Sequence, residues 1–175
     1  DGRAGPLGSF DAVVVAAPAA AAARLLAPLA PAAALPLREV RSASVATVAV
    51  AYPREAAEAV PALAATGLLA PSSTGSLLKA ATFLSRKWPH LDDPDVFLVR
   101  LSAGRAGDPR IAELAYHELV RCLHEDLHRA TGLTGDPVAV HVQRWTDALP
   151  QLEVGHGDRL ADALDDFKVW AAGRD

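Results

Sequence analysis

The sequence contains no methionine and a single cysteine, Cys122, which excludes an internal disulfide. A lone thiol on a predicted helix is usually a small buried hydrophobe. A chain without disulfides suits a reducing compartment, so we expect a cytoplasmic location. Because methionine is absent and Asp1 stands first, we also expect a fragment or a processed product of a longer protein.

Positive charge and uninterrupted apolar runs are also scarce. The 17 Lys and Arg residues are outnumbered by 21 Asp and Glu residues, which gives a formal net charge of -4. Nucleic-acid binding usually needs a basic patch, so nucleic acid is not an expected partner. The apolar stretch 12–37 is interrupted by Arg24 and by four prolines. A spanning helix needs about 20 continuous apolar residues, so no transmembrane span is expected.

Motifs that bind nucleotides are missing as well. The Gly-x-Ser-x-Gly motif of a hydrolase nucleophile is absent. No Gly-x-Gly-x-x-Gly follows a predicted strand, and no phosphate loop occurs. Such loops use backbone N–H groups at a helix start to hold phosphates. We therefore expect no pyrophosphate binding by this chain alone.

What is present is an alternation of strand and helix patterns. Short β-branched or alternating runs predict strands over residues 10–17, 44–52, 67–70, 77–85, 96–102 and 137–144. Apolar residues at spacings of three and four predict helices over residues 18–27 and 109–130 and from about residue 157 onward. A Pro-Ser-Ser-Thr-Gly turn at 71–75 predicts a hairpin. The fold class is therefore α+β, with a mostly antiparallel sheet, a long helix on one face and a detached first strand–helix pair.

One segment of the long predicted helix resembles a zinc motif. His124, Glu125 and His128 fit the His-Glu-x-x-His pattern, in which two histidines on one helix face bind zinc and the glutamate acts as a base. His141, Glu153 or His156 could supply a third ligand. The alternative is a solvated polar stripe formed by His117, Arg121, His124 and His128. The stripe is the favoured interpretation, and we assign no metal ligand.

Several segments together resemble the oxygen-dependent protoporphyrinogen oxidase family in its bacterial, coproporphyrinogen-oxidising form. They read GLLAPSSTG at 67–75, KWPH at 87–90, VRLSAGRAGD at 99–108 and RWTDALPQLEVGH at 144–156. The resemblance runs from about residue 10 to residue 164. It implies a flavin-binding Rossmann-type domain with an inserted sheet domain that covers the substrate.

The resemblance also implies a division of this chain into three parts. Residues 1–40 correspond to a strand–helix remnant of the flavin-binding domain, 41–150 to the substrate-binding sheet domain, and 151–175 to a helix that leads back to the flavin domain. The family's flavin takes hydride equivalents from a porphyrinogen, and oxygen reoxidises it, in heme biosynthesis. The cofactor carries the redox step, and the protein supplies orientation and exclusion of solvent.

Site residues follow from the same resemblance. Thr66, Gly67, Leu69 and Ser102 are the expected substrate-binding residues, and Ala17, Pro18, Trp145 and Pro150 the expected FAD-binding residues. No catalytic residue is assigned. Each position has an ordinary alternative. Gly67 could shape the entry of a strand, Leu69 could belong to the core, and Trp145 could serve packing.

The chain also departs from the family pattern. It lacks the dinucleotide-binding motif, the region of the main substrate-carboxylate arginine and the Gly-rich C-terminal flavin segment. We therefore expect weak or absent flavin binding and no activity in the isolated chain. A second hypothesis is a non-catalytic module that binds a tetrapyrrole, and a zinc hydrolase is the third. Expected partners are the porphyrinogen, missing flavin-domain segments and a ferrochelatase, and the sequence does not choose between coproporphyrinogen and protoporphyrinogen.

Overall fold

The computed structural model describes residue 8 and residues 10–172. It divides into two compact units. The larger unit is Arg41–Gln151, and the smaller one comprises the described residues of Asp1–Val40 and Leu152–Asp175. The chain therefore leaves the smaller unit once and returns to it after the larger unit is complete.

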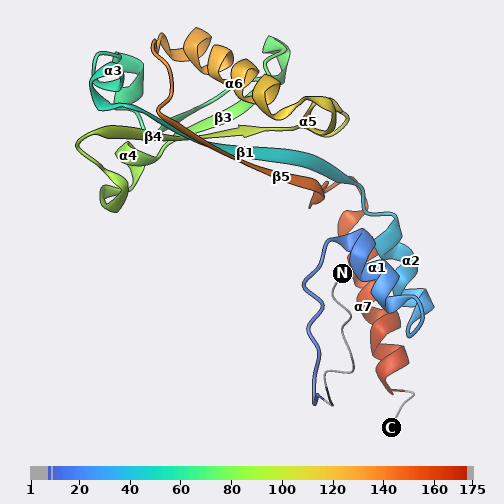
Figure 1. The fold of residues 1–175 in the computed structure, drawn as a ribbon. Coiled ribbons are helices and arrows are strands. Elements are labelled where there is room, and N and C mark those ends of the chain that lie inside the picture. The colour runs from blue at the N-terminus through green and yellow to red at the C-terminus, as the bar shows by residue number, and fades with distance from the viewer. Residues whose placement is uncertain (1–7, 9, 173–175) are drawn as a thin grey trace. The chain divides into compact units, whose positions relative to one another are not determined.

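The larger unit is built on a five-stranded antiparallel sheet with the strand order β2-β3-β4-β1-β5 (Figure 1). Its strands are β1 Ser42–Pro53, β2 Gly67–Leu69, β3 Leu78–Phe83, β4 Val96–Ala103 and β5 Ala139–Pro150. This arrangement confirms the predicted α+β class and its mostly antiparallel sheet. The predicted hairpin is also present, since β2 pairs with β3, across the one-turn 3-10 helix Ser72–Thr74.

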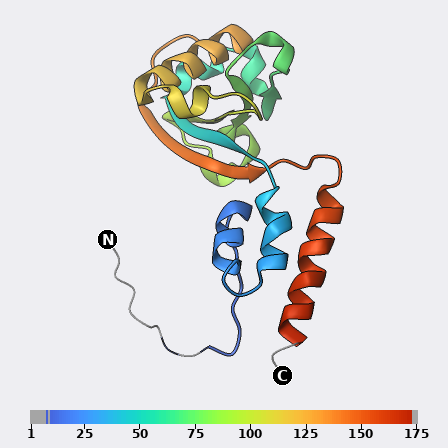
Figure 2. The same cartoon turned by 90° about the vertical axis from the view of Figure 1, so that its right-hand side faces the viewer.

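One face of the sheet is covered by the helix α6, Tyr116–Thr131 (Figure 2). Side chains alternate along a strand, so one set of β1 residues points to this face. That set is fully or almost fully buried together with apolar residues of α6, β3 and β4. The cluster includes Val48, Val50, Tyr52, Ala81, Phe83, Phe97, Val99, Leu101, Leu119, Leu123 and Leu127. This face holds the hydrophobic core, and the opposite face is not covered by α6.

The predicted single helix over 109–130 is two helices. A short α5, Arg110–Glu113, stops where Leu114 turns extended, with ψ 136°. The carbonyls of Ile111 and Leu114 each accept a hydrogen bond from the Arg144 guanidinium at 2.6 Å. The prediction of one continuous helix was therefore wrong. The Arg144 side chain, from the distant strand β5, donates hydrogen bonds to backbone carbonyls near the end of α5.

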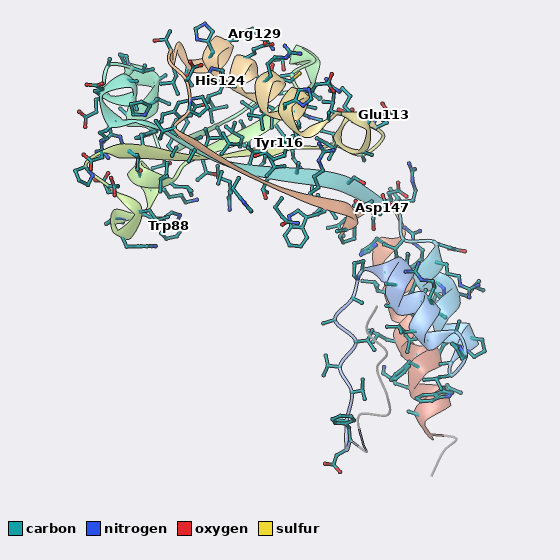
Figure 3. The ribbon with its side chains drawn as sticks, in the orientation of Figure 1. Trp88, Glu113, Tyr116, His124, Arg129 and Asp147 are labelled. Carbon is teal, nitrogen blue, oxygen red and sulfur yellow. The ribbon has the colours of Figure 1, made fainter. Side chains whose placement is uncertain are left out.

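Short helices occupy most of the remaining connections of the larger unit. They are α3 Arg54–Glu58, the 3-10 helix Pro61–Ala64, α4 Leu84–Lys87 and the 3-10 helix Pro89–Leu91. Proline precedes α3 and begins both 3-10 helices, at positions where its missing N–H costs nothing, whereas α4 follows Phe83 without a proline. The loop containing Trp88 thereby lies on the side of the sheet opposite His124 and Arg129 (Figure 3).

The described residues of the smaller unit form three helices. They are α1 Ala19–Leu26, α2 Pro31–Arg38 and α7 His156–Ala172. The middle helix α2 contacts both others, and its alanines Ala33 and Ala34 are buried. Small side chains at these positions let the helix axes approach closely.

The predicted strand over residues 10–17 is not formed. These residues pair with no strand in the described part of the chain, and Val13 and Val14 are exposed. A β-branched run favours extended backbone, but a strand also needs neighbours for its N–H and C=O groups. Here Val13, Val14 and Val15 instead border an apolar hollow of about 460 Å³, together with residues of α1, α2 and α7.

None of the helices in the described residues combines the length and the apolar character that crossing a bilayer would require.

Candidate functional site

The sheet face opposite α6 is lined mainly by small and polar side chains. Strand pairing aligns them in two rows that cross all five strands. The first row is Gly67, Thr82, Arg100, Ala49 and His141. The second row is Leu69, Ala80, Ser102, Thr47 and Gln143. We call this surface the open face, and a flat ligand can approach its backbone closely because most of its side chains are short.

The open face brings together three of the four predicted substrate-binding residues. Gly67 and Ser102 lie in neighbouring rows, and Leu69 lies at the edge of the second row. Leu69 is 84% exposed, so it is not a core residue. Thr66 precedes β2, and its carbonyl accepts a hydrogen bond from the Phe83 N–H at 3.0 Å. The contact of these residues with a ligand stays a prediction.

A hollow of about 280 Å³ lies at the β2 edge of the open face. Its lining includes Thr66, Gly67, Leu69, Ala80, Thr82 and Lys87. Lys87 comes from the last residue of α4, which follows β3 directly along the chain. The hollow therefore combines predicted substrate residues with a cation that the sequence reasoning did not select.

Gly67 has a structural reason to be glycine. A Cβ at this position would lie 2.4 Å from the Ala81 carbonyl oxygen and 3.3 Å from the Thr82 Cα. Both atoms belong to backbone, which cannot move aside cheaply. The structure thus accounts for Gly67 by the close approach of β3, whether or not a ligand also passes near it.

Two half-exposed tryptophans belong to this part of the larger unit. Trp145 pairs with Val45 in a β1–β5 ladder whose register shifts between Ala43 and Val45, and it is 50% exposed. Trp88 is 46% exposed and its ring centroid lies 6.3 Å from that of His90. Single exposed apolar side chains are ordinary on protein surfaces, so the exposure of these two tryptophans does not by itself assign a ligand.

The end of β5 is held in an irregular conformation beside Trp145. Asp147 has φ 45°, a left-handed value that aspartate tolerates better than most residues. Its N–H donates to the Ser44 Oγ at 3.0 Å, and the Ser44 hydroxyl donates to the Asp147 carboxylate at 3.1 Å. Pro150 pairs with Ser42 at the final position of the strand. These contacts fix the backbone that carries Trp145 and Pro150.

The four predicted flavin contacts are split between the two units. Trp145 and Pro150 belong to the larger unit, and Ala17 and Pro18 belong to the smaller one. The Pro18 carbonyl accepts hydrogen bonds from the N–H groups of Ala21 and Ala22 at 2.8 and 2.9 Å and so begins α1.

The described residues fit a flavin only in part. Trp145 offers a half-exposed aromatic side chain, and its contact with a flavin, like that of Pro150, stays a prediction. The sequence supplies no glycine-rich loop for a pyrophosphate.

The side chains of the His-Glu-x-x-His segment have hydrogen-bond and ion-pair partners within the larger unit. His124 Nδ1 shares a hydrogen bond of 2.9 Å with the Tyr52 hydroxyl, and His128 Nδ1 lies 2.8 Å from the Leu133 carbonyl. Glu125 forms an ion pair with Arg121 at 2.6 Å. Among the residues that the structure describes, no three His, Cys, Asp or Glu side chains lie close enough together to hold a metal ion.

The proposed third ligands do not complete the motif either. His141 lies on the open face, on the opposite side of the sheet from α6. Glu153 and His156 belong to the smaller unit. The structure therefore favours the polar helix face over the zinc hydrolase.

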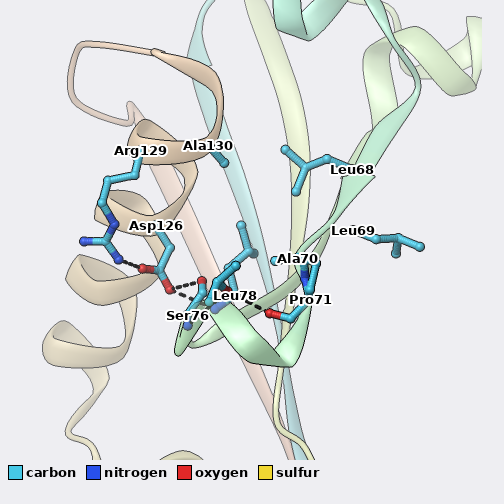
Figure 4. Close-up of a pocket in the computed structure, with 10 residues that line it drawn as sticks. Leu68, Leu69, Ala70, Pro71, Ser76, Leu78, Asp126, Arg129 and Ala130 are labelled. Carbon is cyan, nitrogen blue, oxygen red and sulfur yellow. Dashed lines mark hydrogen bonds and ion pairs between the residues drawn. The ribbon is translucent and has the colours of Figure 1, made fainter.

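A second hollow, of about 350 Å³, lies between α6 and the β2–β3 hairpin (Figure 4). Asp126, only 6% exposed, accepts hydrogen bonds from the Ser76 hydroxyl at 2.7 Å and from the Leu78 N–H at 2.9 Å. It also pairs with Arg129. A buried carboxylate needs such partners. Asp126 therefore holds the hairpin against α6, and its negative charge is balanced by Arg129.

The sequence reasoning missed Lys87 and Arg100 as candidates, and it considered His141 only as a possible zinc ligand, not as part of this face. Arg100 and His141 sit on strands separated by a long stretch of chain, and only the register of the sheet shows that they share a row. The alternation of side chains along each strand indicates which face of the sheet a residue lies on. It carries no information about which residues of the other strands lie beside that residue.

Comparisons with known proteins point in one direction. Residues 1–173 match the family described as flavin containing amine oxidoreductase. The chain is 33% identical over 152 residues to the coproporphyrinogen III oxidase of Bacillus subtilis, covering 87% of this chain and 32% of that protein. It is 39% identical over 152 residues to the coproporphyrinogen III oxidase of Mycobacterium tuberculosis, again covering 87% of this chain and 32% of that protein.

A solved structure agrees with these relatives. The chain resembles a structure from an Exiguobacterium species assigned as a protoporphyrinogen oxidase, with a TM-score of 0.70 and 26% identity. The match covers 85% of this chain and 32% of that one. The chain thus spans about a third of the length of the proteins that it matches.

Proposed function

Because the chain belongs to the flavin-containing amine oxidoreductase family, we propose that it forms the substrate-binding side of an FAD-dependent porphyrinogen oxidase. The observation that carries the proposal is the open face, where small side chains in two rows leave room for a flat macrocycle. The similarity to coproporphyrinogen III oxidases supports the choice of substrate class.

In this proposal the chain's own residues bind and orient the macrocycle. Gly67, Ala80 and Ser102 let the ring approach the sheet, and Leu69 covers one edge. Covering one side of the ring keeps water from that side, which is the protein's usual contribution in cofactor enzymes.

The flavin belongs to the same proposal. Trp145 and Pro150 would border its ring system, and Ala17 and Pro18 would belong to the flavin-binding part of the protein. A bound flavin supplies the redox chemistry, since it accepts hydride equivalents from the reduced macrocycle.

The three helices of the smaller unit are assigned to the flavin domain, with the remaining segments of that domain as their partner. A cytoplasmic location and a ferrochelatase as recipient of the product complete the proposal.

A binding experiment tests the proposal without any flavin. Coproporphyrin III, the stable oxidised form of the macrocycle, is titrated into the purified chain while the Soret absorbance is recorded. We expect saturable binding of about one porphyrin per chain. Replacing Ser102 by Trp should abolish it, because the indole would fill the centre of the open face.

A matched control separates a blocked face from general damage. Thr134→Trp places the same side chain on the exposed loop after α6 and should leave binding unchanged. Absence of porphyrin binding to the folded wild-type chain, or equal binding by the Ser102→Trp variant, would show that the open face is not the substrate surface.

A further inference from the structure

One cationic side chain contacts a hydroxyl group on the open face, and a second cationic side chain lines the hollow beside that hydroxyl. The Arg100 Nη2 lies 3.5 Å from the Thr82 Oγ1. Thr82 and Lys87 line the same hollow of about 280 Å³ at the β2 edge. Thr82 therefore contacts a guanidinium from β4, and the hollow that it lines is also lined by Lys87 from α4.

Neither cation has a carboxylate partner. Arg100 and Lys87 form no ion pair with any residue that the structure describes. Neither row of the open face contains an acidic residue. Among the described residues, Lys87 contacts the face of the neighbouring Trp88 ring, with its Nζ 5.6 Å from the ring centroid. By contrast, Arg54, Arg110, Arg121 and Arg129 all pair with carboxylates elsewhere in the larger unit.

We propose that Arg100, Thr82 and Lys87 form a subsite that binds a carboxylate of the tetrapyrrole substrate. The inference rests on the proposed function and names the polar contacts of that same site. A guanidinium can hold both oxygens of a carboxylate, an ammonium adds a point charge, and a threonine hydroxyl adds a donor. The three groups lie beside the small residues of the two rows. A substrate whose carboxylate is bound there would place its macrocycle over Ala80 and Ser102.

The experiment compares an acid with its ester on the full chain. Coproporphyrin III and its tetramethyl ester are titrated separately into the wild-type chain and the Arg100→Gln and Lys87→Gln variants. For the acid we expect the Kd to rise about tenfold in Arg100→Gln and about threefold in Lys87→Gln, because the contacts are partly solvated. Arg100→Lys, which keeps the charge but loses the fork, should fall between wild type and Arg100→Gln.

The ester and a control variant show whether the effect is specific. The ester carries no charge, so its Kd should be the same in all variants. Arg121→Gln removes a positive charge from α6, on the other side of the sheet, and should not change the Kd of the acid. Added salt should reduce the preference for the acid in the wild type, because it screens exposed charges.

The outcomes separate this inference from the proposed function. If neither porphyrin binds the folded wild-type chain, both the proposed function and the subsite are wrong. If the acid binds equally well to wild type, Arg100→Gln and Lys87→Gln, the open face can still be the substrate surface, but the carboxylate subsite is wrong.

Discussion

At the scale of single residues, the role of a polar group depends on the partner that the fold gives it. His124 belongs to a sequence that fits a zinc motif, yet its ring shares a hydrogen bond with the Tyr52 hydroxyl and stacks on the Tyr52 ring at a centroid distance of 5.8 Å. Arg100 belongs to an ordinary strand sequence, yet it is a cation without a carboxylate on the open face. The zinc motif and the proposed carboxylate subsite therefore involve different residues.

Tyr52 should make stability sensitive to alkaline pH. Burial raises the pKa of Tyr52 from 10.0 to about 12, so the unfolded chain releases this proton at a lower pH than the folded chain. The resulting stability is complete below about pH 10 and is lost as the pH rises towards 12. Denaturant unfolding at pH 8 to 12 should show a smaller loss for Tyr52→Phe than for wild type.

Tyr116→Phe is the control for this pH experiment. Tyr116 is 53% exposed, so its removal should leave the alkaline loss as in wild type. At neutral pH, Tyr52→Phe should cost about 1 kcal/mol, since one hydrogen bond to His124 disappears. Identical pH profiles for wild type and Tyr52→Phe would contradict the assignment.

At the scale of elements, one arginine decides where a helix ends. Arg144 points to the core side of β5 and donates to carbonyls near the end of α5. α6 then starts anew, with the Glu118 carboxylate accepting the Ala115 N–H at 3.0 Å. The break lets α5 and α6 follow different directions over the sheet, as Figure 1 shows.

Arg144→Ala should loosen this joint. The carbonyls of Ile111 and Leu114 would lose their donors, which costs about 1–3 kcal/mol for buried groups. We expect a lower free energy of unfolding and faster amide hydrogen exchange over residues 110–115. Gln143→Ala, at the adjacent position on the opposite face of β5, should change neither quantity. Equal exchange in wild type and Arg144→Ala would show that Arg144 does not stabilise the junction between α5 and α6.

At the scale of the whole molecule, the two units differ in how completely they bury apolar surface. The larger unit has a closed core, whereas the smaller unit leaves many large apolar side chains exposed. They include Phe10, Val13, Val14, Leu25, Leu35, Leu152, Val154, Leu164 and Val169. The chain also spans only about a third of the length of its relatives. Both observations fit the proposal that further segments of a flavin domain cover the smaller unit.

The chain by itself should not retain flavin. The sequence has no glycine-rich phosphate-binding loop, which is the usual holder of the FAD pyrophosphate. Chain purified after incubation with excess FAD and gel filtration should show absorbance at the flavin bands far below one flavin per chain. A relative of full length treated in the same way serves as the positive control. A stoichiometric flavin on this chain would overturn the expectation.

The sequence by itself determined the class of the fold and the similarity to porphyrinogen oxidases. Alternation in β1 and β4, the turn between β2 and β3 and the apolar stripe of α6 are local patterns, and each reports which side of its own element is buried. The same patterns were misleading for residues 10–17, because extended backbone becomes a strand only beside a partner strand.

Only the tertiary structure decided which residues of different elements meet. The row from Gly67 through Thr82 and Arg100 to His141 depends on the register of five strands. The interruption between α5 and α6 depends on Arg144, which lies 30 residues beyond Leu114. Such contacts arise from packing between distant parts of the chain, and a local period in the sequence carries no information about them.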